Sequence, residues 1–208
     1  MRTQYEGAGP LDPRELADEP VAQLRRWLEE AVDAGLPSPN AMVLASVDAG
    51  GQPHSRYVLL RGLELRGLSF YTNYSSAKGR QLDANPAAAL TFGWLPAHRQ
   101  VRVTGRVRRL GEAENDAYFA SRPRATQIGT WASAQSEVIE SREVLLAGVA
   151  EAERRFAGRE VERPPDWGGY LLEPEEVEFW QGQPDRLHDR LRYRGAPGGG
   201  WILERLSP

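Results

Sequence analysis

Between residues 41 and 108 the chain contains a series of short segments with the pattern of β-strands, separated by turns, and this series limits the fold more than any other feature. The pattern is clearest over residues 99–108, where Val101, Val103 and Val107 fall on one face and polar side chains on the other. A period of two is typical of a β-strand with one buried face. Turns rich in Gly separate these segments, which favours an antiparallel sheet.

The periodicity divides the whole chain into strands and helices. Apolar residues at helical spacing predict helices over residues 20–34, 112–121 and 136–156. Strands are expected over residues 42–47, 55–60, 68–72, 87–92, 99–108, 170–172, 177–180 and 201–206. We therefore predict an α+β fold, an antiparallel β-barrel with peripheral helices. Residues 1–19 are expected to form a flexible N-terminal segment and residues 20–208 a single domain.

The composition excludes several classes of site. The chain has 208 residues and no cysteine, so disulfides, thiolate metal ligands and cysteine nucleophiles are absent. His54, His98 and His188 are scattered, which argues against a structural zinc site. A net charge of -3 argues against general nucleic-acid binding. No apolar run approaches the ~20 residues of a membrane span and no signal peptide is evident, so we expect a cytoplasmic protein without a membrane partner.

Arg186, His188 and Arg190 occupy alternate positions near the end of the chain. On an extended strand these three groups would project from one face, with Leu187 pointing into the core. Their mutual repulsion is unfavourable unless an anionic ligand lies beside them, and Arg suits phosphate and carboxylate oxygens. The alternative is a solvated edge strand whose charges deter aggregation.

Lys78 is the only lysine among the 26 basic residues. It follows the segment Tyr71–Ser76, which leads from a strand into a helix expected to begin near Ser76. Hydroxyls, helix-terminal amides and one compact ammonium group are typical of a phosphate cradle. An ordinary capped turn with an exposed lysine is the alternative.

A second candidate anion site lies around the end of the helix expected over residues 112–121. Tyr118 and Arg122 are four residues apart and share a face, and Thr126 adds a hydroxyl. The alternative is a surface Arg packed along a Tyr ring. Residues 127–136 are expected to form a loop over an aromatic ligand or against a partner subunit. No catalytic triad or paired-carboxylate site is evident, which favours chemistry carried out by a bound cofactor.

With these segments in view, the chain resembles the pyridoxamine/pyridoxine 5'-phosphate oxidases. The resemblance extends through almost the whole sequence and rests on Pro39–Met42, Arg56–Leu60, Phe70–Asn73, Arg99–Val103, Tyr118–Pro123, Gln127–Gly129, Trp131–Ser136, Trp167–Gly169, Glu178–Arg190 and Arg205–Pro208. It implies a Greek-key FMN-binding split barrel that works as a homodimer with FMN at the subunit interface. The implied reaction oxidises pyridoxamine or pyridoxine 5'-phosphate to pyridoxal 5'-phosphate and reduces O2 to H2O2.

The resemblance also implies roles for individual residues. Those expected to contact FMN are Arg56, Tyr57, Val58, Leu59, Leu60, Arg61, Tyr71, Thr72, Lys78, Gln100, Gln135, Ser136, Trp180 and Arg190. Those expected to bind the substrate are Arg2, Tyr5, Arg61, Tyr118, Arg122, Thr126, Arg186 and His188. Arg186 and His188 are expected to lie over the substrate ring as the catalytic pair. No metal is implied.

The sequence departs from the usual family pattern at three positions. Arg61 stands where Lys is typical, Ala77 where Arg is common, and Thr126 where Ser is common. On one uninterrupted strand, moreover, Arg56 and Arg61 would lie on opposite faces.

Two other functions remain open. One is a related flavin oxidase of secondary metabolism, of the phenazine type. Arg122 and the segments Gln127–Gly129 and Trp131–Ser133 fit the vitamin B6 enzyme better. The other is a non-catalytic split-barrel protein that binds FMN or pyridoxal phosphate. Arg186 and His188 argue against it, because such a protein has no need of groups that orient a substrate ring.

Overall fold

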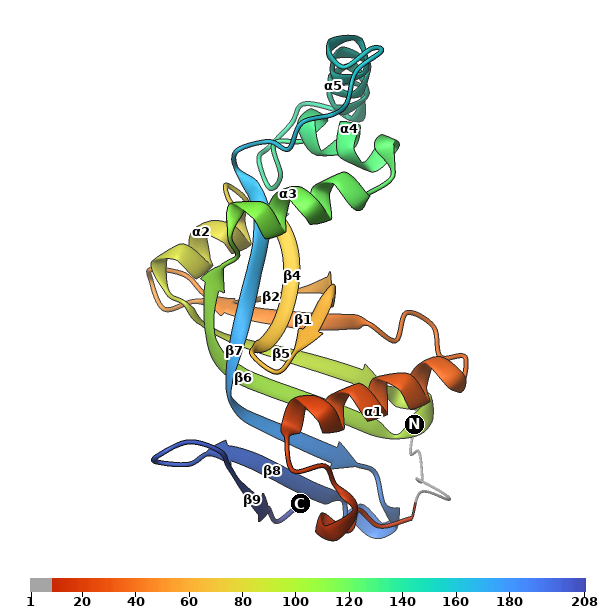
Figure 1. Cartoon of the computed structure of the whole chain (residues 1–208), viewed down its shortest axis with the longest axis vertical. Helices are drawn as coiled ribbons and strands as arrows, with labels where there is room; N and C mark the ends of the chain where they lie inside the picture. The colour runs from red at the N-terminus through yellow and green to blue at the C-terminus, as the bar shows by residue number, and fades with distance from the viewer. Residues whose placement is uncertain (1–8) are drawn as a thin grey trace.

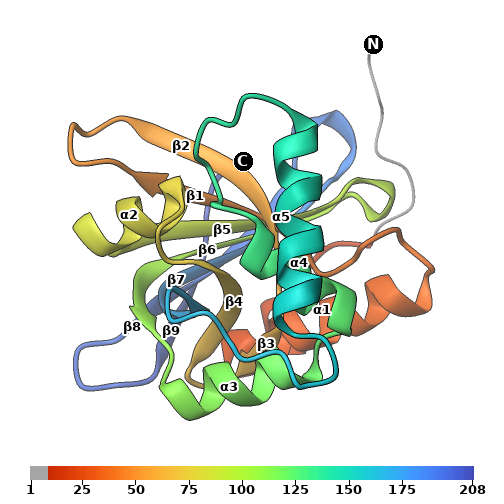
Figure 2. The same ribbon diagram turned by 90° about the horizontal axis from the view of Figure 1, so that it is seen from above.

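The computed structural model describes residues 9–208, which form one curled antiparallel β-sheet with helices around it (Figures 1 and 2). The strands are β1 (Ala41–Val47), β2 (Pro53–Leu59), β3 (Gly62–Glu64), β4 (Gly67–Asn73), β5 (Ala87–Trp94), β6 (Arg99–Arg109), β7 (Trp167–Gln181), β8 (Asp189–Gly195) and β9 (Trp201–Arg205). The helices are α1 (Pro20–Asp33), α2 (Ala77–Ala84), α3 (Glu112–Ser121), α4 (Arg124–Ala132) and α5 (Arg142–Arg155). Short 3-10 turns lie at Pro13–Glu15, Leu95–Ala97 and Pro184–Arg186.

The sheet is closed on itself by the segment that joins β2 to β3. The strand order is β2-β1-β5-β6-β7-β4-β3, so β2 and β3 lie at opposite ends of the pairing path although they are consecutive in the chain. The Leu60 N–H donates to the Asn40 carbonyl oxygen at 2.9 Å, beside β1. One residue later, the Arg61 N–H donates to the Ser69 carbonyl oxygen at 2.9 Å, in β4. The chain therefore passes directly from one end of the sheet to the other, and this crossing, the seam, makes a partly closed barrel.

The connectivity confirms the expected antiparallel α+β barrel. Strands β5, β6 and β7 are neighbours in chain order, whereas β4 precedes β5 in the chain but lies beside β7. This is the order of a Greek key. All the pairings are antiparallel.

Strand β7 is a single long strand where two short ones were expected, over residues 170–172 and 177–180. Its first part pairs with β4 and its last part with β8, while β6 pairs along both parts. A β-bulge marks the change of partner: Thr104 pairs with Glu176 but Gly105 with Pro174, so one residue of β7 is left over. Because of this bulge the strand continues through Pro174, where the sequence pattern predicted a break between two strands.

The alternation predicted for β6 is confirmed by burial. Val101, Val103 and Val107 are buried in the barrel core, while Arg102 and Arg108 are exposed. Helix α1 covers this core where the ring of Trp27 meets Phe179 edge-on at 5.1 Å. A second apolar cluster holds α3, α4 and α5 together at the upper end of β7 (Figure 1). It consists of Phe119, Ile128, Ala152, Phe156, Val161 and Trp167.

The helical region after α3 differs from the prediction. The helix expected over residues 136–156 begins only at Arg142, and the loop expected over residues 127–136 is largely helix α4. Helix α4 contains Gly129 and β-branched residues, which are weak helix formers. It is stabilised instead by tertiary contacts, because Ile128 is buried and the Gln127 side-chain amide donates to the Phe119 carbonyl oxygen at 2.9 Å.

The predicted row of Arg186, His188 and Arg190 on one strand face is wrong. Strand β8 begins only at Asp189, and Arg186 lies in a 3-10 turn with a positive φ of 64°. Leu187 is 71% exposed instead of entering the core. Pro184 starts the turn, and the Gln183 N–H closes it by donating to His188 Nδ1 at 3.0 Å.

The start of the described range is tied to the end of the chain. Leu11 is buried, and its N–H donates to the carboxylate of Asp189 at 3.1 Å. The flexibility predicted for residues 1–19 is not tested by these contacts. Within residues 9–208, no helix is both long enough and apolar enough to cross a membrane.

The bulge gives a testable prediction about stability. A Cβ at Gly105 would lie 2.0 Å from the Glu173 carbonyl oxygen, whereas a Cβ at Gly93 in the neighbouring strand would meet nothing within 4 Å. We expect Gly105→Ala to lower the free energy of unfolding by about 1–3 kcal/mol or more, because two backbones must separate. Gly93→Ala should leave it unchanged or raise it slightly. Urea unfolding of both variants checks this, and equal stabilities would contradict the packing argument.

Candidate functional site

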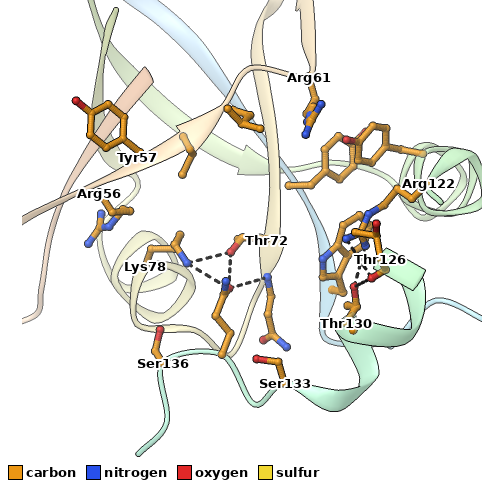
Figure 3. A pocket seen from close by; sticks show the side chains of 18 of the residues that line it. Arg56, Tyr57, Arg61, Thr72, Lys78, Arg122, Thr126, Thr130, Ser133 and Ser136 are labelled. Carbon is orange, nitrogen blue, oxygen red and sulfur yellow. Dashed lines mark hydrogen bonds between the residues drawn. The ribbon is translucent and has the colours of Figure 1, made fainter. Parts of the chain in front are cut away.

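A cavity of 1140 Å³ lies at the seam (Figure 3). Its walls come from the end of β2, the crossing segment, β4, the start of α2, the end of α3, α4 with the loop after it, and the start of β7. Most residues predicted for the cofactor and substrate line it, namely Arg56, Tyr57, Val58, Leu59, Arg61, Tyr71, Thr72, Lys78, Tyr118, Arg122, Thr126, Gln135 and Ser136. The structure thus brings together segments that lie up to 111 positions apart in the sequence, from Arg56 to Trp167.

The seam explains how Arg56 and Arg61 reach the same cavity. On an uninterrupted strand they would lie on opposite faces, but β2 ends at Leu59 and the chain then changes its hydrogen-bonding partner strand. Both arginines consequently line the cavity. Leu60, which was predicted to contact the cofactor, is 6% exposed, packs in the barrel core and is not part of the cavity wall.

The cavity contains four cationic side chains, from Arg56, Arg61, Lys78 and Arg122, and no carboxylate lines its wall. Within residues 9–208, none of the four has a carboxylate oxygen within 4.0 Å, although most other arginines in this range do, such as Arg192. Burial lowers the pKa values of Arg56 and Arg122, and it lowers the pKa of Lys78 to about 8 with a contribution from the charge of Arg56. Clustered cations without counter-ions indicate a site for anions.

The cations form two pairs at opposite ends of the cavity. Arg56 and Lys78 lie at one end, beside α2, and Arg61 and Arg122 at the other, beside α3 (Figure 3). Electrostatic coupling follows the same division, because the charge of Arg56 lowers the pKa of Lys78 and that of Arg61 lowers the pKa of Arg122. The cavity is therefore suited to two separate anionic groups.

The first end gathers the groups from which a phosphate cradle was predicted. Helix α2 begins directly after Ser76, whose hydroxyl accepts from the Gly79 N–H, as the sequence predicted. Lys78 Nζ donates to Thr72 Oγ1 and to Gln135 Oε1, each at 3.2 Å. Thr72 Oγ1 also donates to Gln135 Oε1 at 2.9 Å. The ammonium of Lys78 and the hydroxyl of Thr72 thus lie together beside the N-terminus of α2.

The second end is built around the guanidinium of Arg122. Its Nη1 donates to Thr130 Oγ1 at 2.9 Å, and its plane lies over the Trp167 ring, 4.6 Å from the ring centroid. Tyr118 stacks on Tyr71 at 3.8 Å between ring centroids and lies parallel to Trp167. The wall here is a stack of aromatic rings with a cation at its edge, which is suited to a flat, anionic ligand.

Sequence reasoning missed Trp167 and Thr130 as site residues. Trp167 lies in the segment Trp167–Gly169, on which the family resemblance partly rests, but no role in the site was expected of it. Thr130 lies one helical turn after Thr126, on a helix that was not expected. In the described part of the chain, no group of three or more His, Cys, Asp or Glu residues is arranged to hold a metal ion.

The other predicted cofactor residues form a second group that does not line the cavity. Gln100 on β6 is directly opposite Trp180 on β7, and Trp180 is directly opposite Arg190 on β8. Opposite residues of antiparallel strands project on the same side, so these three make a continuous row. Arg190 is paired with the buried carboxylate of Glu178 at 2.8 Å, unlike the four cations of the cavity.

Arg186 and His188 adjoin this row and also lie outside the cavity wall. The His188 ring is 4.8 Å from the Trp180 ring, centroid to centroid. Strand β8 lies at the end of the molecule opposite to α3 and α4 (Figure 1). Arg2 and Tyr5, predicted to cover the substrate, lie outside the described residues.

Two sequence families match the chain. Residues 28–156 match the family described as "Pyridoxamine 5'-phosphate oxidase". Residues 167–208 match the family described as "Pyridoxine 5'-phosphate oxidase C-terminal dimerisation region". The first match includes every described residue of the cavity except Trp167. The second includes Trp180, Arg186, His188 and Arg190.

Curated relatives are similar over the full chain. A pyridoxine/pyridoxamine 5'-phosphate oxidase of Cupriavidus necator is 53% identical over 96% of this chain and 94% of its own length. A protein with the same description from Rubrobacter xylanophilus is 53% identical over 100% of this chain and 95% of its own.

Two solved structures confirm the split-barrel fold. PhzG of Burkholderia lata, in complex with tetrahydrophenazine-1-carboxylic acid, has a TM-score of 0.89 and 36% sequence identity, over 95% of this chain and 98% of its own. A pyridoxamine 5'-phosphate oxidase-related, FMN-binding protein of Nostoc punctiforme has a TM-score of 0.71 and 20% identity, over 96% and 100% of the two chains.

The lowered pKa of Lys78 predicts how anion binding depends on pH. Because the free protein loses the Lys78 proton as pH rises through about 8, the affinity for sulfate, which does not titrate in this range, should fall above pH 8. Lys78→Met should bind sulfate more weakly and without this decline. The sulfate affinity of the unmodified protein and of Lys78→Met can be measured by competition with a bound flavin, followed by fluorescence between pH 6.5 and 9.5. A decline of equal size in Lys78→Met would assign it to another group.

Proposed function

The chain belongs to the pyridoxamine 5'-phosphate oxidase family, and on this premise we propose that it oxidises pyridoxamine and pyridoxine 5'-phosphate to pyridoxal 5'-phosphate. The observation that carries the proposal is the cavity with a pair of cations at each end. A flavin mononucleotide and the substrate have one phosphate each, and each cation pair is suited to bind one of them.

The first end suits the phosphate of FMN. Arg56 and Lys78 supply charge, Thr72 a hydroxyl, and the N-terminus of α2 its backbone N–H groups. Ala77 removes one donor that relatives commonly have, so Lys78 and Arg56 would carry more of the contact. When bound, the flavin takes two electrons from the substrate and passes them to O2, which leaves as H2O2.

The second end suits the substrate phosphate. Arg122 is fixed by Thr130 and Trp167, Arg61 faces the same space, and Tyr118 and Thr126 line the wall between them. Holding the phosphate at this end fixes the distance of the reacting C4' carbon from the other end of the cavity. Orientation and exclusion of water are then the main contributions of the protein to the reaction.

The second group of residues would act in the partner subunit's cavity. Trp167 lines the cavity at the start of β7 and Trp180 belongs to the row at its end, thirteen positions later. At about 3.3 Å a residue these positions are roughly 40 Å apart along the strand, less the bend at the bulge. The row is therefore far from the Trp167 wall of its own chain's cavity, and in a homodimer with FMN at its interface it would meet the partner subunit's cavity instead.

In that homodimer, Arg186 and His188 would lie over the substrate ring, and Trp180 and Arg190 beside the flavin. His188 Nδ1 accepts from the Gln183 N–H, so in the neutral ring the proton is on Nε2. His188 can then present a fixed donor to the substrate. Arg2 and Tyr5 would cover the substrate from the N-terminal segment.

A phenazine-type oxidase is the second candidate, because PhzG has the same fold at 36% identity. The ligand in the PhzG structure has a carboxylate, which one cation pair could also bind. The higher identity to the pyridoxine/pyridoxamine 5'-phosphate oxidases, 53%, favours the first function. A non-catalytic flavin-binding protein is the third.

An assay of the purified protein distinguishes the three functions. Supplied with FMN, it should convert pyridoxamine 5'-phosphate, O2 and water into equal amounts of pyridoxal 5'-phosphate, ammonia and H2O2. The aldehyde absorbance and a peroxide assay measure the products. Turnover of a dihydrophenazine carboxylate alone would favour the second candidate. Flavin bound without turnover of either substrate would favour the third.

Mixed dimers test the shared site. Arg122→Ala should lower kcat/KM for pyridoxamine 5'-phosphate about tenfold to a hundredfold, since a charge-assisted contact to phosphate is lost. Arg186→Ala should lower turnover while FMN stays bound. When the two variants are co-expressed, about half of the dimers are mixed and one of their two sites is intact, so about a quarter of the activity should return.

The control is co-expression of Arg122→Ala with Lys78→Met. Both changes lie in the same cavity, so every site of every dimer carries one of them and no activity should return. Equal recovery in the two mixtures would show that the row and the cavity do not meet across a dimer.

A further inference from the structure

Arg56 is held by neutral oxygen atoms and forms no ion pair with a carboxylate of the described residues. Its Nη1 donates to Ser46 Oγ at 2.5 Å and, at 3.4 Å, to the Leu44 carbonyl oxygen. Its Nη2 donates to Gln81 Oε1 at 2.8 Å. Ser46 Oγ in turn donates to Gln81 Oε1 at 2.7 Å, so the three side chains form a closed triangle.

The donor and the acceptor of each hydrogen bond in this triangle follow from the chemistry of the three side chains. A guanidinium can only donate, so the Gln81 atom that faces it is the amide oxygen. The Ser46 hydroxyl accepts from Arg56 and therefore directs its own proton to Gln81. Ser46 is 1% exposed and Gln81 9%, so both contacts are shielded from water. Shielded contacts of this kind fix a side chain more firmly than solvated ones.

A glutamate at position 81 would have almost the same shape as glutamine but would place a negative charge beside Arg56. Arginines of this protein that meet carboxylates form ion pairs, as Arg192 does with Glu176 and Glu204. The glutamine at position 81 accepts the same hydrogen bonds without adding a charge. The positive charge of Arg56 therefore remains available to a ligand in the cavity.

Gln81 also connects the two cations at this end of the cavity. It lies on α2 three residues after Lys78, so both project from one side of that helix. Arg56 lies on β2, at the opposite end of the sheet's pairing path from β4 and β3. The Arg56–Gln81 hydrogen bond ties strand β2 to helix α2 and so sets where the guanidinium lies relative to the Lys78 ammonium.

We propose that Gln81, supported by Ser46, is a positioning residue that orients Arg56 toward the phosphate of the cofactor while leaving its charge uncompensated. This rests on the proposed function, in which the end of the cavity beside α2 binds the phosphate of FMN. Gln81 does not line the cavity and acts only through Arg56. Its effect should accordingly be confined to the phosphate of the ligand.

The test compares FMN with riboflavin, which has the same ring and ribityl chain but no phosphate. Dissociation constants of both are measured by flavin fluorescence on the flavin-free, full-length protein at fixed ionic strength. Gln81→Glu should weaken FMN binding about tenfold or more, because it pairs Arg56 internally, and should change riboflavin binding by less than about twofold. Gln52→Glu, on the exposed β1–β2 turn, adds the same charge as a control and should change neither constant.

Gln81→Met is the second variant, in case Gln81→Glu does not fold, as judged by its unfolding transition. It is neutral and of similar length but accepts no hydrogen bond from Arg56, so FMN binding should again weaken selectively. Unchanged FMN binding in either folded variant, or equal weakening of FMN and riboflavin binding, would overturn the proposal. If the unmodified protein binds no FMN, the proposed function itself fails, a result that these variants cannot produce.

Discussion

The site depends on one feature of the backbone. At Leu60 and Arg61 the chain crosses from one end of the sheet's pairing path to the other. The two successive N–H groups donate to Asn40 beside β1 and to Ser69 in β4. This transfer closes the barrel along a seam and makes the cavity, because side chains before and after the crossing now face one space. A straight continuation of β2 would have placed Arg56 and Arg61 on opposite faces of the sheet.

The electrostatics of the cavity follow from that arrangement. Four cations gather where the described chain supplies no carboxylate, and burial lowers the pKa values of Arg56, Lys78 and Arg122. Such a cluster is unfavourable in the free protein, so the barrel core and the apolar cluster under α3 to α5 must stabilise it. The uncompensated charge would favour the binding of anionic groups in the proposed site. Outside the cavity most arginines of the described residues lie beside an acidic residue, as Arg190 does beside Glu178.

The sequence predicted what depends on local pattern. The alternation of residues 99–108 predicted β6 and its buried valines, and the helix expected to begin near Ser76 is α2. The prediction failed where specific side-chain contacts, near or distant in the sequence, decide the conformation. Helix α4 is held by burial of Ile128, and the turn at Arg186 is closed by His188 and Gln183, neither of which leaves a periodic signal. The sequence pattern also could not predict the neutral partners of Arg56, because Ser46 and Gln81, 35 residues apart, come into contact only in the folded barrel.

The length of β7 connects the fold to the proposed assembly. One strand carries Trp167 in the cavity at its start and Trp180 in the row at its end, so a rigid element holds the two half-sites apart. A two-fold axis that brings one row to the partner subunit's cavity must bring the other row to the first cavity, because the contact is reciprocal. Each cofactor would then be bound by both chains. Cofactor affinity and dimer stability are in that case thermodynamically linked, and each strengthens the other by the same free energy.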